Sequence, residues 1–234
     1  MTKRAVLLDA LGTLLELEDP GPALVEELAR RDAEVTVDEA REAVLAEMTY
    51  YRAHHDEASD AARLADLRRR CAEVLREALP EPARGLGVPA LTEALLAALR
   101  FRPYAEVPEA LRALRAQGLT LVVLSNWDVS LHEQLAATGL AELVDGAVSS
   151  AELGVGKPHP DIYARALEVA GATAAEAVMV GDSPDTDVEG ALACGIDAVL
   201  VDRWGSGPHP PTAPAGAHVV TSLAEVPALI ESLA

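Results

Sequence analysis

Short apolar runs that end at a turn alternate with helical patterns along much of this chain. The first run is Ala5–Leu8, followed at once by Asp9 and a Gly12-Thr13 turn, and such a run predicts a short buried strand. Further strands are predicted at Leu119–Leu124, Gly146–Val148, Ala177–Val180 and Ala198–Val201. Helical patterns between and after them are found at Val107–Gln117, Val129–Thr138, Pro160–Ala170 and Val188–Ala193, and a terminal helix closes the chain. Apolar strands alternating with helices predict a parallel sheet covered on both faces.

The segment from Pro20 to about Arg100 has helical periodicity and no strand pattern. Four helices are expected in it: Pro22–Arg31, Asp38–Ala53, a third that begins after Ser59 as N-cap and ends before Pro80, and Pro89–Arg100. These helices follow the first strand directly and precede the remaining strands. We therefore expect an α/β core made of residues 1–15 and 103–234, and an inserted helical domain made of residues 16–102.

Composition and charge limit the classes of function. The chain of 234 residues is 50% hydrophobic and 24% charged, which predicts a globular protein. Its formal net charge of −19 argues against a nucleic-acid groove or an anionic membrane surface as partner, because both need clustered cations. No segment approaches the ~20 apolar residues of a membrane helix.

The two cysteines and the first residues bear on where the protein resides. Cys71 and Cys194 have no CxxC or Cys/His spacing and are interpreted as reduced thiols of an intracellular protein. The start at Lys3 and Arg4 resembles a signal peptide, but Asp9 interrupts its apolar region. We expect a cytoplasmic protein that is a monomer or a homodimer.

The polar residues of interest all follow predicted strands. In parallel sheets, ligands bind outside the carboxyl ends of the strands, and the inserted helices are expected to overhang the same edge. The residues at these ends are Asp9, Thr13, Ser125, Asn126, Lys157, Asp182 and Asp187.

Taken in order, these residues form a recognisable set. Asp9 with Thr13 is followed by a Ser-Asn pair at a strand end, a lone Lys-Pro, and a Gly-Asp with a second aspartate five residues later. The set resembles that of the haloacid dehalogenase (HAD) superfamily of hydrolases, in the branch whose helical cap is inserted after the first strand. The resemblance spans nearly the whole chain. It implies a three-layer, Rossmann-like parallel sheet core with an all-helical cap domain.

The residue types fit phosphoryl transfer. A carboxylate such as Asp9 can attack phosphorus and form an aspartyl-phosphate. The hydroxyls of Thr13 and Ser125, the amide of Asn126 and the charge of Lys157 can bind the phosphoryl oxygens. We therefore expect these five residues to be the catalytic and substrate-binding residues. The expected substrate is a small phosphorylated molecule.

A magnesium site is expected beside them. Asp9, Asp182 and Asp187 offer the hard oxygen ligands that Mg²⁺ prefers, and Asp185 competes with Asp187 for that role. The family resemblance adds the backbone carbonyl of Leu11 as a further ligand.

Leu11 departs from the phosphatase pattern, and this keeps other functions open. Phosphatases of the superfamily usually carry a second aspartate at this position, which protonates the leaving oxygen, and losing such a group costs ~10²–10⁴ in rate. One interpretation is a phosphatase that is slow on alkyl phosphates, or one helped by His54 or His55, which are expected to contact the substrate. Another is a 2-haloacid dehalogenase, since those relatives also lack this aspartate. A third is a degenerate phosphatase fold that serves as a binding module.

Overall fold

A six-stranded parallel sheet forms the centre of the computed structural model, which describes residues 2–203 and 213–233. The strand order is β5-β4-β1-β6-β7-β8. Its strands are β1 (Ala5–Leu8), β4 (Thr120–Ser125), β5 (Gly146–Ser149), β6 (Ala177–Gly181), β7 (Asp197–Val201) and β8 (His218–Val220). Strand β1 pairs in parallel with β4 on one side and β6 on the other. The predicted α/β fold with a parallel sheet is therefore confirmed.

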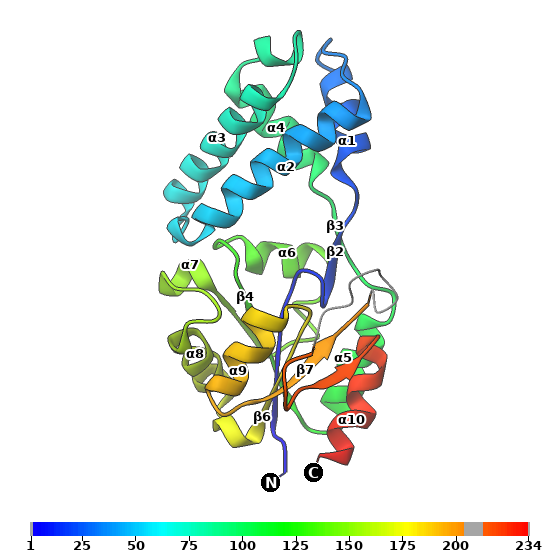
Figure 1. Cartoon of the computed structure of the whole chain (residues 1–234), viewed down its shortest axis with the longest axis vertical. Helices are drawn as coiled ribbons and strands as arrows, with labels where there is room; N and C mark the ends of the chain where they lie inside the picture. The colour runs from blue at the N-terminus through cyan, green and yellow to red at the C-terminus, as the bar shows by residue number, and fades with distance from the viewer. Residues whose placement is uncertain (1, 204–212, 234) are drawn as a thin grey trace. The chain divides into compact units, whose positions relative to one another are not determined.

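Helices cover both faces of this sheet, as Figure 1 shows. On one face lie α8 (Pro160–Ala170) and α9 (Gly190–Ala193), and on the other lie α5 (Val107–Ala116) and α10 (Val226–Ser232). The shorter helical segments of this unit are α6 (Leu131–Ala137), α7 (Ser150–Leu153), η3 (Ala174–Glu176), η4 (Pro184–Glu189) and η5 (Leu223–Glu225). Strand residues alternate between the two faces, so both faces are apolar and both are buried. Strand β1 is fully buried along its length.

One face of the sheet shows how the core supports the polar edge. Leu7 of β1 and Met179 of β6 pack in one cluster with Tyr163 of α8 and Val188 of η4, and all four are fully buried. This packing anchors the end of β1, which Asp9 follows, and the η4 turn, which contains Asp187.

The chain forms two compact units, Met1–Glu16 with Pro103–Ala234, and Leu17–Arg102. The second, which we call the helical unit, has four long helices: α1 (Pro20–Ala29), α2 (Val37–His54), α3 (Ala61–Ala78) and α4 (Val88–Ala98). Two short 3₁₀ segments, η1 (His55–Glu57) and η2 (Ala83–Gly85), connect them. The N-cap of α3 is Asp60, whose carboxylate accepts hydrogen bonds from the amides of Ala62 and Arg63. The prediction of Ser59 was wrong by one residue, because the aspartate next to it is an equally good cap.

Several elements are missing from the sequence prediction. Strands β2 (Leu15–Leu17) and β3 (Phe101–Pro103) pair as a two-stranded sheet, where the chain passes between the two units. The last strand, β8, and helix α7 were also unexpected. Each is short and contains a polar or charged residue, so none forms the uninterrupted apolar run by which the equally short β1 was predicted.

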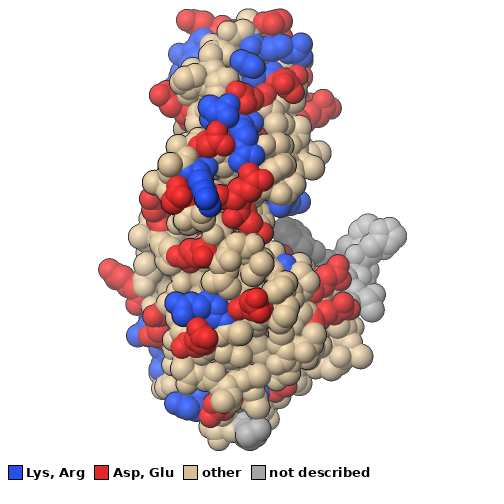
Figure 2. Space-filling model, turned by 90° about the vertical axis from the view of Figure 1, so that its left-hand side faces the viewer, with Lys and Arg blue, Asp and Glu red and all other residues tan. Residues whose placement is uncertain are grey.

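The surface carries charges of both signs. On the face drawn in Figure 2, Lys and Arg side chains are interspersed with Asp and Glu. Arg69 of α3, for example, forms ion pairs with Asp66 and Glu73 on its own helix. Within residues 2–203 and 213–233, no helix combines the length and the apolar character needed to cross a membrane.

Candidate active site

Three adjacent strands place the candidate residues together. Asp9 follows β1, Ser125 ends β4 and Asp182 follows β6. Because β4, β1 and β6 are neighbours in the sheet and run parallel, their carboxyl ends lie side by side. The η4 turn after β6 adds Asp187, and the loop before α8 adds Lys157.

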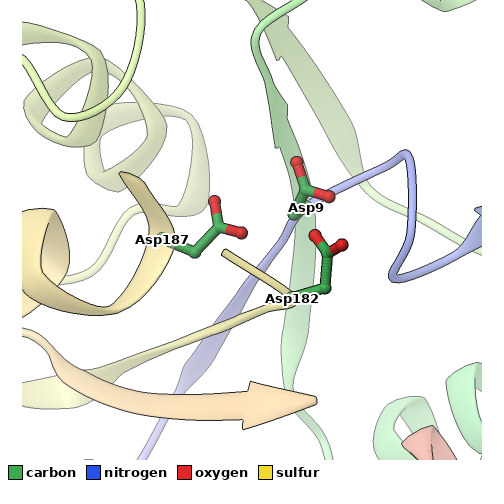
Figure 3. Close-up of side chains that lie close together, drawn as sticks. All are labelled: Asp9, Asp182 and Asp187. Atoms are coloured by element: carbon green, nitrogen blue, oxygen red, sulfur yellow. The ribbon is translucent and has the colours of Figure 1, made fainter. Parts of the chain in front are cut away.

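The carboxylates of Asp9, Asp182 and Asp187 form one group, which we call the carboxylate cluster. One oxygen from each lies within 4.8 Å of the others, and Figure 3 shows the three side chains gathered at the strand ends. Asp9 and Asp187 are buried, while Asp182 keeps an exposed surface. Asp185 is exposed and is not part of this group.

Lys157 is the buried cation of the site. Its Nζ lies 2.6 Å from Asp9 Oδ1 and 2.6 Å from Asp187 Oδ1, and its side chain is only 2% exposed. Burial alone would lower the pKa of Lys157, but the two carboxylates outweigh it and raise the pKa. Lys157 is therefore charged and held in a fixed place between two acids.

One ammonium group does not balance three carboxylates. Burial, with the charges of Asp187 and Asp182, raises the pKa of Asp9 to about 7 even though Lys157 opposes the shift. Asp182 keeps an exposed surface, but partial loss of solvent around its carboxylate, with the charge of Asp187, raises its pKa to about 6. Crowded carboxylates repel one another unless a cation joins them, so the cluster favours binding of a further cation.

Two orphaned polar atoms point to the same conclusion. Asp9 Oδ2 and Thr13 Oγ1 are buried and have no hydrogen-bond partner among the described residues. Buried polar groups are nearly always paired in native proteins. The cluster offers the carboxylate oxygens that Mg²⁺ prefers, and the residues present therefore fit a magnesium ion.

Two glycines make room for the cluster. A Cβ atom on Gly12 would lie 2.1 Å from Asp182 Oδ2, and one on Gly181 would lie 2.2 Å from Asp187 Oδ2. Each carboxylate thus packs directly against backbone where no side chain intervenes. The predicted site residues are close together because these two positions are glycine.

Asn126 has contacts that the sequence did not predict. Its amide Nδ2 donates to the Lys157 carbonyl at 2.9 Å, and its Oδ1 accepts from the Lys157 amide at 2.6 Å. Both polar atoms of the side chain therefore hold the backbone of Lys157. Ser125 Oγ lies 3.5 Å from Asp9 Oδ1 and is buried, beside the predicted nucleophile.

His54 and His55 belong to the helical unit. The ring of His54 stacks on Tyr50 with centroids 4.0 Å apart, and His55 Nδ1 lies 2.7 Å from Asp56 Oδ1. Their contact with a substrate stays a prediction. From the sequence, Trp204 near the end of the last predicted strand is expected either to pack or to line the site, and His209 is expected at the surface; both lie outside the described residues.

Two residues near the site escaped the sequence analysis. Tyr163 of α8 is buried, and its hydroxyl donates to the Thr186 carbonyl in the η4 turn. Arg203, two residues after β7, donates to the carbonyls of Gly12 and Thr13. Arg203 follows the end of a strand, so the rule that selected the other residues could have found it, whereas nothing in the sequence singles out Tyr163.

Curated proteins similar to this chain include phosphatases. Over 146 residues the chain is 39% identical to the phosphoserine phosphatase of Thermus thermophilus, a match that covers 60% of this chain and 57% of the relative. The first curated relatives are matched over about two fifths to three fifths of their own length.

Solved structures resemble the chain over its whole length. A HAD phosphatase from Thermococcus onnurineus is 27% identical, with a TM-score of 0.67 and 97% of each chain covered. The L-2-haloacid dehalogenase of Xanthobacter autotrophicus is 25% identical, with a TM-score of 0.71 and 100% of each chain covered. Both phosphatases and dehalogenases thus share this fold.

The family itself is decided by a wider match. The family model described as haloacid dehalogenase-like hydrolase matches residues 3–195. This range includes Lys157 and all three residues of the carboxylate cluster. The chain belongs to the haloacid dehalogenase-like hydrolase family.

Proposed function

We propose that this hydrolase is a Mg²⁺-dependent phosphatase that acts on a small phosphorylated metabolite through an aspartyl-phosphate intermediate. The main observation in support of this proposal is the carboxylate cluster. A nucleophile that works without metal has no need of two more acids within 4.8 Å, because they only raise its pKa and reduce the fraction that is ionised. Asp9, Asp182 and Asp187 would hold the ion, with the Leu11 carbonyl as the fourth protein ligand.

The chain's own residues supply most of the chemistry. The Asp9 carboxylate attacks phosphorus, the phosphorus–oxygen bond to the alcohol breaks, and water later cleaves the aspartyl-phosphate to give inorganic phosphate. Lys157, Ser125 and Thr13 bind the phosphoryl oxygens, while Asn126 fixes the Lys157 backbone. Bound Mg²⁺ supplies positive charge against the phosphoryl oxygens.

Leu11 determines which substrates react quickly. It carries no group that can protonate the leaving oxygen, and the proton then has to come from water or from another part of the chain. We propose that substrates with good leaving groups are preferred. The helical unit would select the substrate, with His54 and His55 as its proposed contacts. The proposed enzyme works in the cytoplasm as a monomer or a homodimer.

The test is phosphate release from p-nitrophenyl phosphate with Mg²⁺ and with a chelator. Wild type is expected to release phosphate only with Mg²⁺, and Asp9→Asn to release none. Leu11→Asp adds the missing acid/base group. With an alkyl phosphate as the substrate of the same assay, we expect it to release phosphate about 10²-fold faster than wild type, or more. Absence of release from both wild type and Leu11→Asp would overturn the proposal.

A matched pair of aspartates tests the metal site. Asp182→Asn removes one acid of the cluster, and we expect it to raise the Mg²⁺ concentration for half-maximal activity at least tenfold, by the ~10–100-fold typical of perturbed metal sites. Asp185→Asn, an exposed neighbour outside the cluster, should leave it unchanged. Equal effects of the two changes would contradict the assignment of Asp182.

Dehalogenation of 2-haloacids is the second candidate. One observation in its favour is Leu11, which stands where phosphatases have their acid/base aspartate. The other is the solved L-2-haloacid dehalogenase that matches the full length of the chain. In that reaction Asp9 would displace halide from carbon without metal. Halide release from 2-chloropropionate in the presence of a chelator, lost in Asp9→Asn, would favour it over the phosphatase.

A further inference from the structure

Arg203 lies at the carboxyl end of the sheet without belonging to the carboxylate cluster. It follows β7, and its side chain is 11% exposed. Its Nε donates to the Gly12 carbonyl at 3.1 Å, and its Nη2 donates to the Thr13 carbonyl at 2.7 Å. One guanidinium thus holds two consecutive peptide groups of the loop that follows the nucleophile Asp9.

The rest of the guanidinium is also occupied. Its Nη1 donates to Glu106 Oε1 at 2.5 Å, and its Cζ lies over the ring of Tyr104, 3.6 Å from the ring centroid. Burial raises the pKa of Glu106, but the hydrogen bond and the charge of Arg203, together with the other hydrogen bonds to this carboxylate, outweigh burial and lower the pKa. With two carbonyls, a carboxylate and an aromatic face as partners, Arg203 is suited to hold the loop and not to bind a substrate.

The same loop also packs against a member of the carboxylate cluster. Asp182 packs so closely against Gly12 that a Cβ there would lie 2.1 Å from its carboxylate. Gly12 therefore contacts both a member of the carboxylate cluster and the Arg203 guanidinium. A small rotation of this peptide would move either the Leu11 carbonyl before it or Thr13 after it.

The residues before and after Gly12 each have a polar group without a hydrogen-bond partner among the described residues. Thr13 Oγ1 is buried and unpaired within the described residues. The carbonyl of Leu11 accepts no hydrogen bond in residues 2–203 and 213–233. Since Arg203 takes the next two carbonyls, the one before them is left for another ligand.

We propose that Arg203 is a positioning residue, which orients the Leu11–Thr13 backbone so that the Leu11 carbonyl and the Thr13 hydroxyl face bound Mg²⁺ and phosphate. This rests on the proposed phosphatase function. Arg203 acts through the loop and touches no reacting atom. Geometry matters here as well as charge, because lysine cannot reproduce two parallel bonds from one planar group.

Arg203→Met and Arg203→Lys test the proposal in the full-length protein. The first readout is the Mg²⁺ concentration that gives half-maximal thermal stabilisation, which needs no turnover. We expect Arg203→Met to raise this concentration about 10–100-fold and Arg203→Lys to raise it less. In phosphate release, kcat should fall about 10–100-fold while KM stays within about threefold, since a misplaced loop slows reaction more than binding.

A control and a rescue separate positioning from general destabilisation. Arg115→Met removes another arginine of the same unit, ion-paired to Asp145 at 3.1 Å, and should leave the Mg²⁺ response and kcat unchanged. In Arg203→Ala, added guanidinium chloride at millimolar concentration should restore part of kcat, which a purely structural role would not allow. A raised KM with unchanged kcat, or an Arg203→Met variant that matches Arg115→Met, would overturn the inference.

The two proposals fail in different ways. If wild type neither responds to Mg²⁺ nor releases phosphate, the phosphatase function is wrong, and the role of Arg203 falls with it. If wild type does both and Arg203→Met does so equally well, the function stands and only the role of Arg203 is wrong.

Discussion

Gly12 combines a backbone φ of +92° with a carboxylate packed directly against its Cα. Positive φ disfavours any residue with a Cβ, and the lack of space for a Cβ reinforces this at Gly12. The position therefore has two independent reasons to be glycine, one conformational and one functional. They can be separated by experiment because the chain contains a glycine with only the first.

Gly12→Ala and Gly118→Ala form that pair. Gly118 has a φ of +80° with nothing within 4 Å of a Cβ position, so both changes should cost about 1–2 kcal/mol of folding stability through the backbone. Only Gly12→Ala displaces Asp182, and we expect it alone to lose Mg²⁺-dependent stabilisation and at least 10²-fold in phosphate release. Thermal unfolding with and without Mg²⁺ measures the first effect. Retention of the Mg²⁺ response in Gly12→Ala would show that Asp182 can move freely.

The sequence identifies chemical groups at single residues better than it identifies their contacts. Polar residues at strand ends led to Asp9 and Lys157, which the structure places 2.6 Å apart. The two hydrogen bonds of Asn126 to the Lys157 backbone were not predictable, because the two residues are 31 positions apart and only local bonds to peptide groups, such as helix caps, leave a pattern in the sequence. The same holds for the bonds from Arg203 to two loop carbonyls.

Among the helices and strands, those with an apolar or helical pattern of their own could be predicted. The core helix Pro160–Ala170 has the predicted bounds, and β1 likewise. The three-residue strands β2 and β3 were missed, since their pairing depends on residues more than eighty positions apart. The helix expected at Val188 begins earlier, as the π-helical turn η4 at Pro184, where Pro184 fits the first turn of a helix.

Helix α2 contains a buried acid that contributes nothing to the proposed chemistry. Glu47 is 3% exposed, and burial raises its pKa although the Cys71 thiol donates a hydrogen bond to it. A carboxyl group whose folded-state pKa is raised stabilises the fold below its unfolded pKa, and that contribution is lost as the pH rises through the folded pKa. The helical unit should therefore lose stability as the pH rises above about 4.5, the ordinary pKa of a glutamate.

Glu47→Gln removes this titration. We expect the variant to melt about 2–4 °C above wild type at pH 8, with the difference shrinking toward pH 5 as the wild-type carboxyl becomes protonated. Glu42→Gln, at an exposed position of the same helix, should show no pH-dependent difference. A gain that is constant from pH 5 to pH 8 would mean that Glu47 is not the titrating group.

The net charge of −19 acts on the whole molecule. A strongly negative protein concentrates cations around itself and repels anionic substrates. Salt screens this field, with a Debye length of about 10 Å at 0.1 M. The same field thus favours the proposed metal and opposes the proposed substrate.

Added KCl should therefore separate the two effects. Raising it from about 0.02 M to about 0.3 M is expected to raise the Mg²⁺ concentration for half-maximal thermal stabilisation several-fold. At saturating Mg²⁺ the same salt should lower KM for p-nitrophenyl phosphate. Asp182→Asn serves as the control, since its residual response to Mg²⁺ reports binding outside the cluster. Unchanged values in wild type would mean that only local charges matter.

The paired strands β2 and β3 have a consequence for how this protein can be altered. The Glu18 amide donates to the Arg100 carbonyl at 3.0 Å. The first and last residues of the helical unit are therefore close together in space. A segment with adjacent ends can be exchanged without re-routing the sheet. The segment 17–102 can therefore be replaced as a whole. A helical insert from a relative, joined through the same two strands, would give chimaeras that keep Asp9, Lys157 and Asp182. Such chimaeras would differ from one another only in the inserted helices.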